Sequence, residues 1–170
     1  MTVITIDPVT VPASVESSDA GDFLAMIGIL NTAVEHDLGR DHLQWHPAEE
    51  LPGWHDESDM RCRGFLARVG GEPVAALQLM LPTEEAAVEV EFDLLTLPEW
   101  RGRGLEEALL EHLLAEAGAA GRSVVQTYTL HPIPGNGDRM PAPTGFGSVP
   151  VDVHTRFFRD HRTRQRFHQP

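Results

Sequence analysis

Lysine is absent from this 170-residue chain, and cysteine and tyrosine occur only once each, as Cys62 and Tyr128. A Walker phosphate-binding loop needs a lysine, so that motif is excluded. One cysteine cannot form an internal disulfide bond, which suits a reducing compartment. The first residues lack the basic and apolar segments of a signal peptide, and the longest apolar run, residues 23–30, is too short to span a bilayer. We therefore expect a cytoplasmic protein without a membrane partner.

The charge is strongly negative, with 26 acidic residues against 13 basic ones and a net charge of −13. Such a balance argues against nucleic acid as a partner. Residues 151–170 differ from the rest because they contain five arginines and two aspartates, a net charge of +3. The length suits one domain with a full core, which we place at residues 1–161. Residues 162–170 then form a polar basic tail.

The N-terminal half contains patterns for one strand and two helices. Residues 3–6 are apolar enough for a short strand. Residues 19–38 carry apolar side chains at helical spacing, with Asp19 as the expected N-cap. Residues 47–54 predict a short helix or turn that Pro52 interrupts.

The middle of the chain predicts three strands. Residues 65–69 and 74–81 flank two consecutive glycines, a pattern typical of a hairpin. In residues 88–97 valine and phenylalanine first alternate with acids, and the alternation is lost from Leu94. Such a break can mark a β-bulge, which we expect at residues 94–97.

The C-terminal part predicts a helix over 105–120, a strand over 124–130, a loop rich in proline and glycine over 131–150 and a last helix over 151–161. Leu105, with three further apolar residues at helical spacing, forms one face of the first helix. The order of helices and strands indicates an α/β protein with a mixed sheet.

The most informative motif is Arg101-Gly102-Arg103-Gly104-Leu105, between the last of the three strands and the predicted helix. The first N–H groups of a helix have no partner within the helix and carry the positive end of its dipole. Glycines let a phosphate approach these groups, and two arginines add positive charge. The motif therefore predicts a phosphorylated ligand. A dinucleotide-binding fingerprint is disfavoured because Glu107 occupies the position of its third glycine.

The motif resembles the Arg-x-x-Gly-x-Gly/Ala pyrophosphate loop of the GNAT acetyltransferase superfamily. The preceding Leu97-Pro98-Glu99-Trp100 and the later segments 128–131 and 142–150 resemble sequences of actinobacterial GNAT domains, including the first halves of tandem proteins. The resemblance covers residues 4–161. It implies the GNAT acyl-CoA N-acyltransferase fold, a mostly antiparallel mixed sheet with helices on both faces.

The resemblance also implies acetyl-CoA as co-substrate and an amine, small-molecule or peptide, as acceptor. The pyrophosphate would be held by Arg101, Gly102, Arg103, Gly104, Leu105 and Glu106. Main-chain N–H groups around Leu95 and Leu97 would face the thioester, and Glu91 is the expected general base, with Glu89 and Asp93 beside it. Accepting the proton of the amine is worth about 10²–10⁴ in rate.

Three departures favour an alternative, a catalytically impaired module that binds CoA weakly or binds a protein partner. Glu106 stands where the family has Gly or Ala, which opposes a phosphate. Phe158 stands where many members carry a proton-donating Tyr. We find no sequence that corresponds to the two strands that end the family's fold, so we expect a C-terminally truncated domain. Its open sheet edge could pair in a homodimer or with another GNAT domain.

Nine histidines raise the question of a metal site. His42 and His46 are four residues apart, but no His-Glu-x-x-His motif or cysteine pair accompanies them. We therefore expect no metal.

Overall fold

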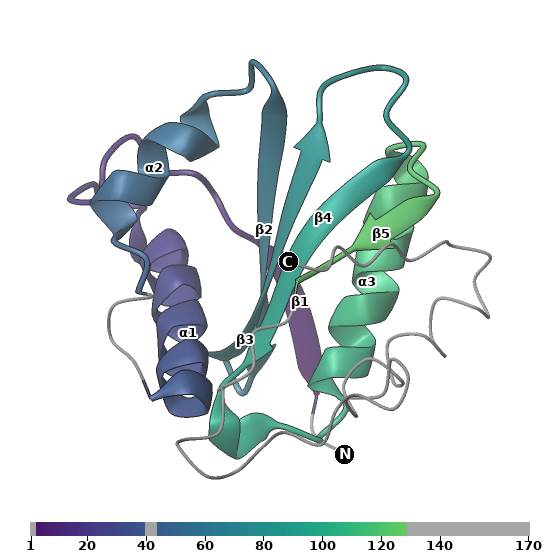
Figure 1. The fold of residues 1–170 in the computed structure, drawn as a ribbon. Helices are drawn as coiled ribbons and strands as arrows, with labels where there is room; N and C mark the ends of the chain where they lie inside the picture. Colours follow the sequence, from purple (N-terminus) through teal and green to yellow (C-terminus); the bar gives the residue numbers. More distant parts are fainter. Residues whose placement is uncertain (1–2, 40–43, 129–170) are drawn as a thin grey trace, which may run out of the picture.

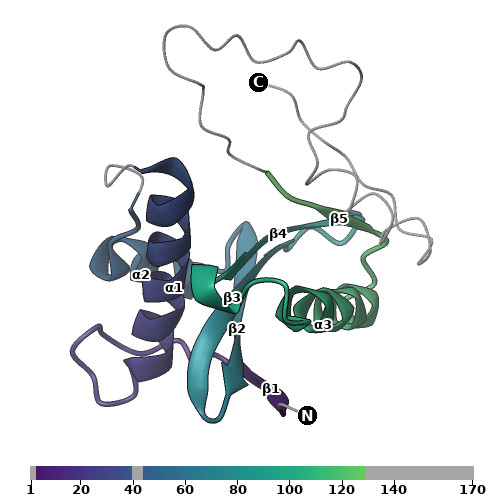
Figure 2. The same cartoon turned by 90° about the horizontal axis from the view of Figure 1, so that it is seen from below.

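The computed structural model describes residues 3–39 and 44–128, which form a five-stranded sheet between two layers of helices (Figures 1 and 2). The elements in chain order are β1 (Ile4–Pro8), α1 (Gly21–Leu38), α2 (Pro47–His55), β2 (Met60–Val69), β3 (Glu72–Pro82), β4 (Glu89–Thr96), the 3-10 turn η2 (Pro98–Trp100), α3 (Leu105–Ala119) and β5 (Val124–Gln126). The loop and last helix predicted over 131–161 and the tail at 162–170 lie outside the described residues.

The strands follow one another across the sheet in sequence order. β1 to β4 pair antiparallel, and β5 joins β4 in parallel. The mixed, mostly antiparallel sheet predicted from the sequence is therefore confirmed. The last strand is shorter than predicted, because it ends at Gln126.

Helix α3 covers one face of the sheet, and α1 and α2 cover the other (Figure 2). Leu105, Leu109, Leu113 and Ala117 are buried on the first face, as the helical spacing predicted. On the opposite face α1 buries Phe23, Met26, Ile27 and Leu30, and α2 adds Leu51 and Trp54. Both faces of the central strands must then be apolar, because both are covered.

The hairpin between β2 and β3 turns at Gly70 and Gly71, as predicted. Both glycines have positive φ, 60° and 89°. A two-residue turn with positive φ at both positions matches the twist of the flanking strands and favours glycine. The turn sets the register of β3 against β2.

Two local predictions are wrong. Ala20, not Asp19, is the N-cap of α1, and no side chain caps this helix. No bulge interrupts the pairing of β4 with β3, whose register is continuous from Glu91 to Thr96. The alternation is lost in the sequence because Leu94 packs on the α3 side and Leu95 on the α1 side. The register shift of this sheet occurs instead in β2, between Ala67 and Arg68.

Gly64 in β2 provides a test of the packing between the sheet and α1. A Cβ atom at this position would lie 2.6 Å from the Met26 sulfur and 3.1 Å from the Val9 Cβ. Because overpacking a filled core costs about 1–3 kcal/mol, we expect Gly64→Ala to lower the free energy of unfolding by that amount. Chemical denaturation measures it. Gly28→Ala in α1, where no atom lies within 4 Å of the new Cβ, is the control and should not destabilise.

Candidate functional site

The loop from β4 to α3 presents the open start of a helix. Gly102 and Gly104 have positive φ values of 68° and 87°, and no atom would lie within 4 Å of a Cβ at either position. Gly104 is the N-cap of α3 and provides no side-chain cap. The first bond within the helix is from the Ala108 N–H to the Gly104 carbonyl. The N–H groups before Ala108 therefore have no partner within the helix, in a place that an anion can approach.

The remaining loop residues fix this geometry or set its charge. Leu105 is buried in the core, so only its main chain can take part in binding. Glu106 and Glu107 occupy the first turn of α3, where carboxylates stabilise the helix dipole but repel an incoming phosphate. The Arg103 guanidinium lies over the Trp100 ring, 4.9 Å from its centroid, a cation–π contact that leaves its charge at the loop.

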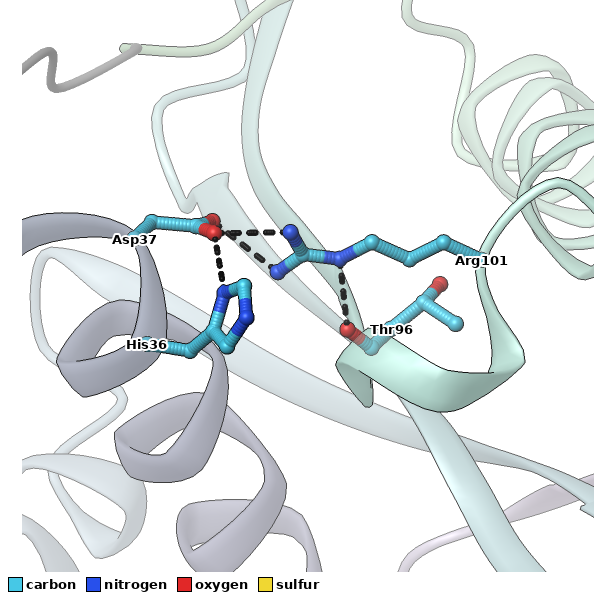
Figure 3. A network of polar contacts seen from close by, with 4 residues as sticks. All are labelled: His36, Asp37, Thr96 and Arg101. Atoms are coloured by element: carbon cyan, nitrogen blue, oxygen red, sulfur yellow. Dashed lines mark hydrogen bonds and ion pairs between the residues drawn. The ribbon is translucent and has the colours of Figure 1, made fainter.

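Arg101 does not point freely into solvent (Figure 3). Its Nη1 and Nη2 atoms donate to the two carboxylate oxygens of Asp37, at 2.7 and 2.9 Å, and its Nε donates to the Thr96 carbonyl at 3.2 Å. Asp37 lies near the end of α1, and its Oδ1 also contacts the His36 Nδ1 at 3.0 Å. Sequence reasoning missed Asp37, because 64 residues separate it from Arg101.

The pKa of Asp37 reflects these contacts. Burial opposes ionisation, but the hydrogen bonds and charges of Arg101 and then His36 outweigh it. They hold the pKa of the carboxyl below its ordinary 3.8. Asp37 and Arg101 therefore form an ion pair at neutral pH.

Strand β4 is paired on both sides only at its beginning. β5 pairs with Glu89, Val90 and Glu91, and no described residue pairs with β4 on that side beyond them. The Leu97 N–H donates to the Val74 carbonyl of β3 at 3.0 Å. In an antiparallel pair bonded residues alternate, so the main-chain groups of Leu95 also face β3.

The groups directed toward the unpaired side are therefore those of Leu94 and Thr96. The bond from Arg101 to the Thr96 carbonyl agrees with this direction. The N–H groups expected to face the thioester were those around Leu95 and Leu97; the Leu97 N–H is engaged with β3 and is not directed to the unpaired side.

Two carboxylates of β4 lie beside each other on the sheet face covered by α1 and α2. The Glu91 Oε1 accepts a hydrogen bond of 2.7 Å from the Gln126 Nε2 of β5. Two residues further on, burial, and then the charge of Glu91, raise the pKa of Asp93 above its ordinary 3.8. Glu89 lies on the same side of the strand. Asp93 therefore holds its proton more tightly than an exposed aspartate does.

Outside this site, three findings concern metal ions, membrane-spanning helices and cavities. In the described part of the chain no group of three His, Cys, Asp or Glu side chains is placed to hold a metal ion. Among the same residues no helix is long and apolar enough to cross a membrane. A cavity of about 220 Å³ near the end of α3 is lined by Arg61, Arg63 and Arg122.

The arginines of this cavity already have partners. Arg61 and Arg63 pair with Glu57 and Glu116. Arg122 donates to the main-chain carbonyls of Pro82 and Ala87.

Comparison with known structures identifies the same fold elsewhere. A tandem GNAT protein from the clavulanic acid biosynthesis pathway superposes with a TM-score of 0.65 at 20% identity, over 83% of this chain and 41% of that one. The chain thus spans about two fifths of the tandem protein. An aminoglycoside acetyltransferase from an uncultured soil metagenomic sample, in complex with sisomicin, superposes with a TM-score of 0.59 at 13% identity, over 98% and 94% of the two chains.

A third structure, the putative acetyltransferase yncA from Salmonella typhimurium with its cofactor acetyl-CoA, gives a TM-score of 0.52 at 19% identity, over 72% and 68% of the chains. No curated protein sequence matches significantly. The model of the Acetyltransferase (GNAT) family matches residues 31–132, which is more than half of the chain and runs from the second half of α1 through β5. This chain is therefore a member of the GNAT family of N-acetyltransferases.

Proposed function

We propose that the protein is an acetyl-CoA-dependent N-acetyltransferase that transfers the acyl group to an amine. The observation that supports this most is the uncapped N-terminus of α3 behind Gly102 and Gly104. It follows β4, which has no partner among the described residues on its β5 side beyond Glu91. Backbone N–H groups for a pyrophosphate and a free strand edge for an extended chain then lie next to each other. Acetyl-CoA has both a pyrophosphate and an extended pantetheine arm.

The pyrophosphate would be held by N–H groups from Gly102 to Glu106, with Arg103 supplying positive charge. The structure is suited to this ligand because a Cβ-sized space is empty above both glycines. The acids Glu106 and Glu107 reduce the affinity, since they add negative charge to the same helix end. We therefore expect weaker binding than a loop with a small residue at position 106 would give.

The pantetheine arm would lie along the open edge of β4 at Leu95–Leu97, as a short strand added to the sheet. The main-chain groups of Leu94 and Thr96 are the ones directed to that edge, so they would bond the arm and polarise the thioester carbonyl. The side chains of Leu95 and Leu97 pack against the α1-side core and hold this segment in place.

We propose Glu91 as the general base, oriented by Gln126, with Asp93 next to it. An amine of the lysine type has a pKa of about 10.4, so it arrives protonated and must lose a proton before it attacks. A carboxylate with a raised pKa accepts that proton more readily, and Asp93 has this property. The negative charge of the pair also favours a cationic acceptor.

The acceptor would be a small-molecule or peptide amine. The structural similarity to aminoglycoside acetyltransferases makes polycationic amines the first compounds to test. The similarity to a tandem GNAT protein likewise makes a second GNAT domain, or a second copy of this chain, the first partner to consider. We place the reaction in the cytoplasm. The alternative, an impaired module that binds CoA weakly or binds a protein, is favoured by Glu106 among the described residues; the other two departures, Phe158 and the end of the fold, lie outside them.

Gly104→Ala tests the loop. A residue with a Cβ is strained at a φ of 87°, and the methyl group enters the space proposed for the phosphate. We expect the affinity for acetyl-CoA, measured by isothermal titration, to fall at least tenfold, about 1.4 kcal/mol. Gly118→Ala in the same helix is the matched control, because its Cβ also meets no atom. It should leave binding unchanged and stabilise by about 0.5–1 kcal/mol.

Glu91→Gln tests the base. We expect kcat toward a panel of polyamines, aminoglycosides and peptides to fall about 10²–10⁴-fold at neutral pH, with part of the loss recovered at high pH, where the amine is neutral. Glu89→Gln, on the same side of β4, is the control and should retain most activity. A parent protein that binds acetyl-CoA but turns over no amine would support the binding module instead.

Asp93→Asn tests the electrostatics of the acid pair. Because folding raises the pKa of Asp93, its ionised form destabilises the folded state, and this cost grows as the pH rises from 3.8 through the folded pKa. Asn has no such cost. We expect the variant to gain unfolding free energy relative to the parent between pH 3 and pH 7, by about 1.4 kcal/mol for each pKa unit. Denaturation of both proteins across this range, with the exposed Glu85→Gln as control, measures it; a constant difference would contradict the burial of this charge.

A further inference from the structure

We propose that Asp37 and Arg101 form a bracket that positions the phosphate loop, and that the Arg101 guanidinium is not itself a phosphate ligand. This inference deepens the proposed function and rests on it for the nature of the ligand. The bracket consists of the Asp37 carboxylate of α1, the Arg101 side chain and the Thr96 carbonyl at the end of β4 (Figure 3).

All three nitrogen atoms of the Arg101 guanidinium donate to these two partners, which uses three of its five N–H groups. Nη1 and Nη2 form parallel bonds to one carboxylate, and Nε donates to a main-chain oxygen only five residues earlier. The guanidinium is planar and rigid, so this arrangement fixes its orientation. The Arg101 side chain therefore links α1 and the end of β4 to the first residue of the glycine loop.

The charge balance favours a bracket over a phosphate ligand. Arg101 and Asp37 neutralise each other at neutral pH, and the low pKa of Asp37 keeps the pair ionised. Two Nη hydrogens of Arg101 are left for a phosphate, but Asp37 already neutralises the charge of the guanidinium, and its carboxylate would lie next to the incoming anion. Arg103 can supply charge at the loop without such a loss, because it contacts only an aromatic ring in the described structure.

The partial exposure of the pair limits what it contributes to overall stability. The side chains of Arg101 and Asp37 are 35% and 40% exposed. Ion pairs of this kind contribute about 0–1 kcal/mol to folding. The effect of the bracket must therefore be local. It holds the Thr96 carbonyl at the open edge of β4 and Gly102 at the start of the loop in a fixed relation to α1.

The bracket also joins two layers that the sheet separates. Helix α1 lies on the face of Glu91 and Asp93, whereas α3 lies on the opposite face. The Arg101 side chain makes this connection at the end of β4. A displacement of the end of α1 would thus reach the phosphate loop through Asp37, without passing through the core.

The test uses Arg101→Lys, Arg101→Gln and Asp37→Asn. Lysine keeps the charge but cannot make the forked contact or the Nε bond, so it separates charge from geometry. If the bracket positions the loop, all three variants weaken acetyl-CoA binding to a similar extent, about tenfold. In an acetylation assay they raise KM for acetyl-CoA more than they lower kcat. The double variant Asp37→Asn/Arg101→Lys should bind acetyl-CoA no more weakly than either single variant. Each single variant already loses the same contact between Asp37 and Arg101.

Two outcomes would overturn the proposal. If Arg101 binds phosphate by its charge, Arg101→Lys binds nearly as well as the parent. If Asp37 competes with phosphate for Arg101, Asp37→Asn binds acetyl-CoA more tightly than the parent. Glu57→Gln and Arg61→Lys alter another exposed ion pair, of 3.2 Å, and are controls that should leave binding unchanged.

Amide hydrogen exchange in the absence of CoA provides a readout that does not depend on the proposed function. We expect Arg101→Lys and Asp37→Asn to increase exchange in residues 97–108 while the core of the sheet stays protected. Unchanged exchange in this segment would refute the bracket. A parent protein that does not bind acetyl-CoA, with exchange increased in the variants, would refute the proposed function and leave the bracket standing.

Discussion

Burial of Leu105 at the first position of α3 is the contact on which the site depends. Its side chain is 1% exposed and belongs to the core between α3 and the sheet. This burial anchors the first turn of the helix and fixes the position from which its unpaired N–H groups point. Gly104 can then be the N-cap without a capping side chain, at some cost in helix stability. The same groups become available to an anion because no partner within the helix satisfies them.

Strand β4 connects this helix end to the proposed chemistry. Its register with β3 is continuous from Glu91 to Thr96, and beyond Glu91 no described residue pairs with its other edge. Because consecutive side chains of a strand point to opposite faces, Glu91 and Asp93 lie on the α1 side while Val90 and Phe92 are in the α3-side core. An acyl donor held along the edge and a base on the strand face would then be only a few residues apart.

Local patterns in the sequence predicted the parts that depend on neighbouring residues. The two-glycine turn, the apolar face from Leu105 to Ala117 and the glycine loop all follow from spacing over a few residues. The position of Leu97 could not be predicted in the same way, since its N–H is taken by Val74 through the β3–β4 register. The loss of alternation at Leu94 and Leu95 was attributed to a bulge, whereas its cause is the burial of both faces. Asp37 gave no signal, because only the tertiary fold brings it to Arg101.

The central claim is that main-chain N–H groups at the start of α3 hold the pyrophosphate of acetyl-CoA. A titration of ¹⁵N-labelled protein with acetyl-CoA, followed by NMR, tests it most directly. The account predicts that the largest shifts fall on the amides of Gly102, Arg103, Gly104, Leu105 and Glu106, with a second group at Leu94 and Thr96. The 3′-dephospho form of CoA should produce the same pattern. Shifts confined to other surfaces, or none at millimolar acetyl-CoA, would contradict it.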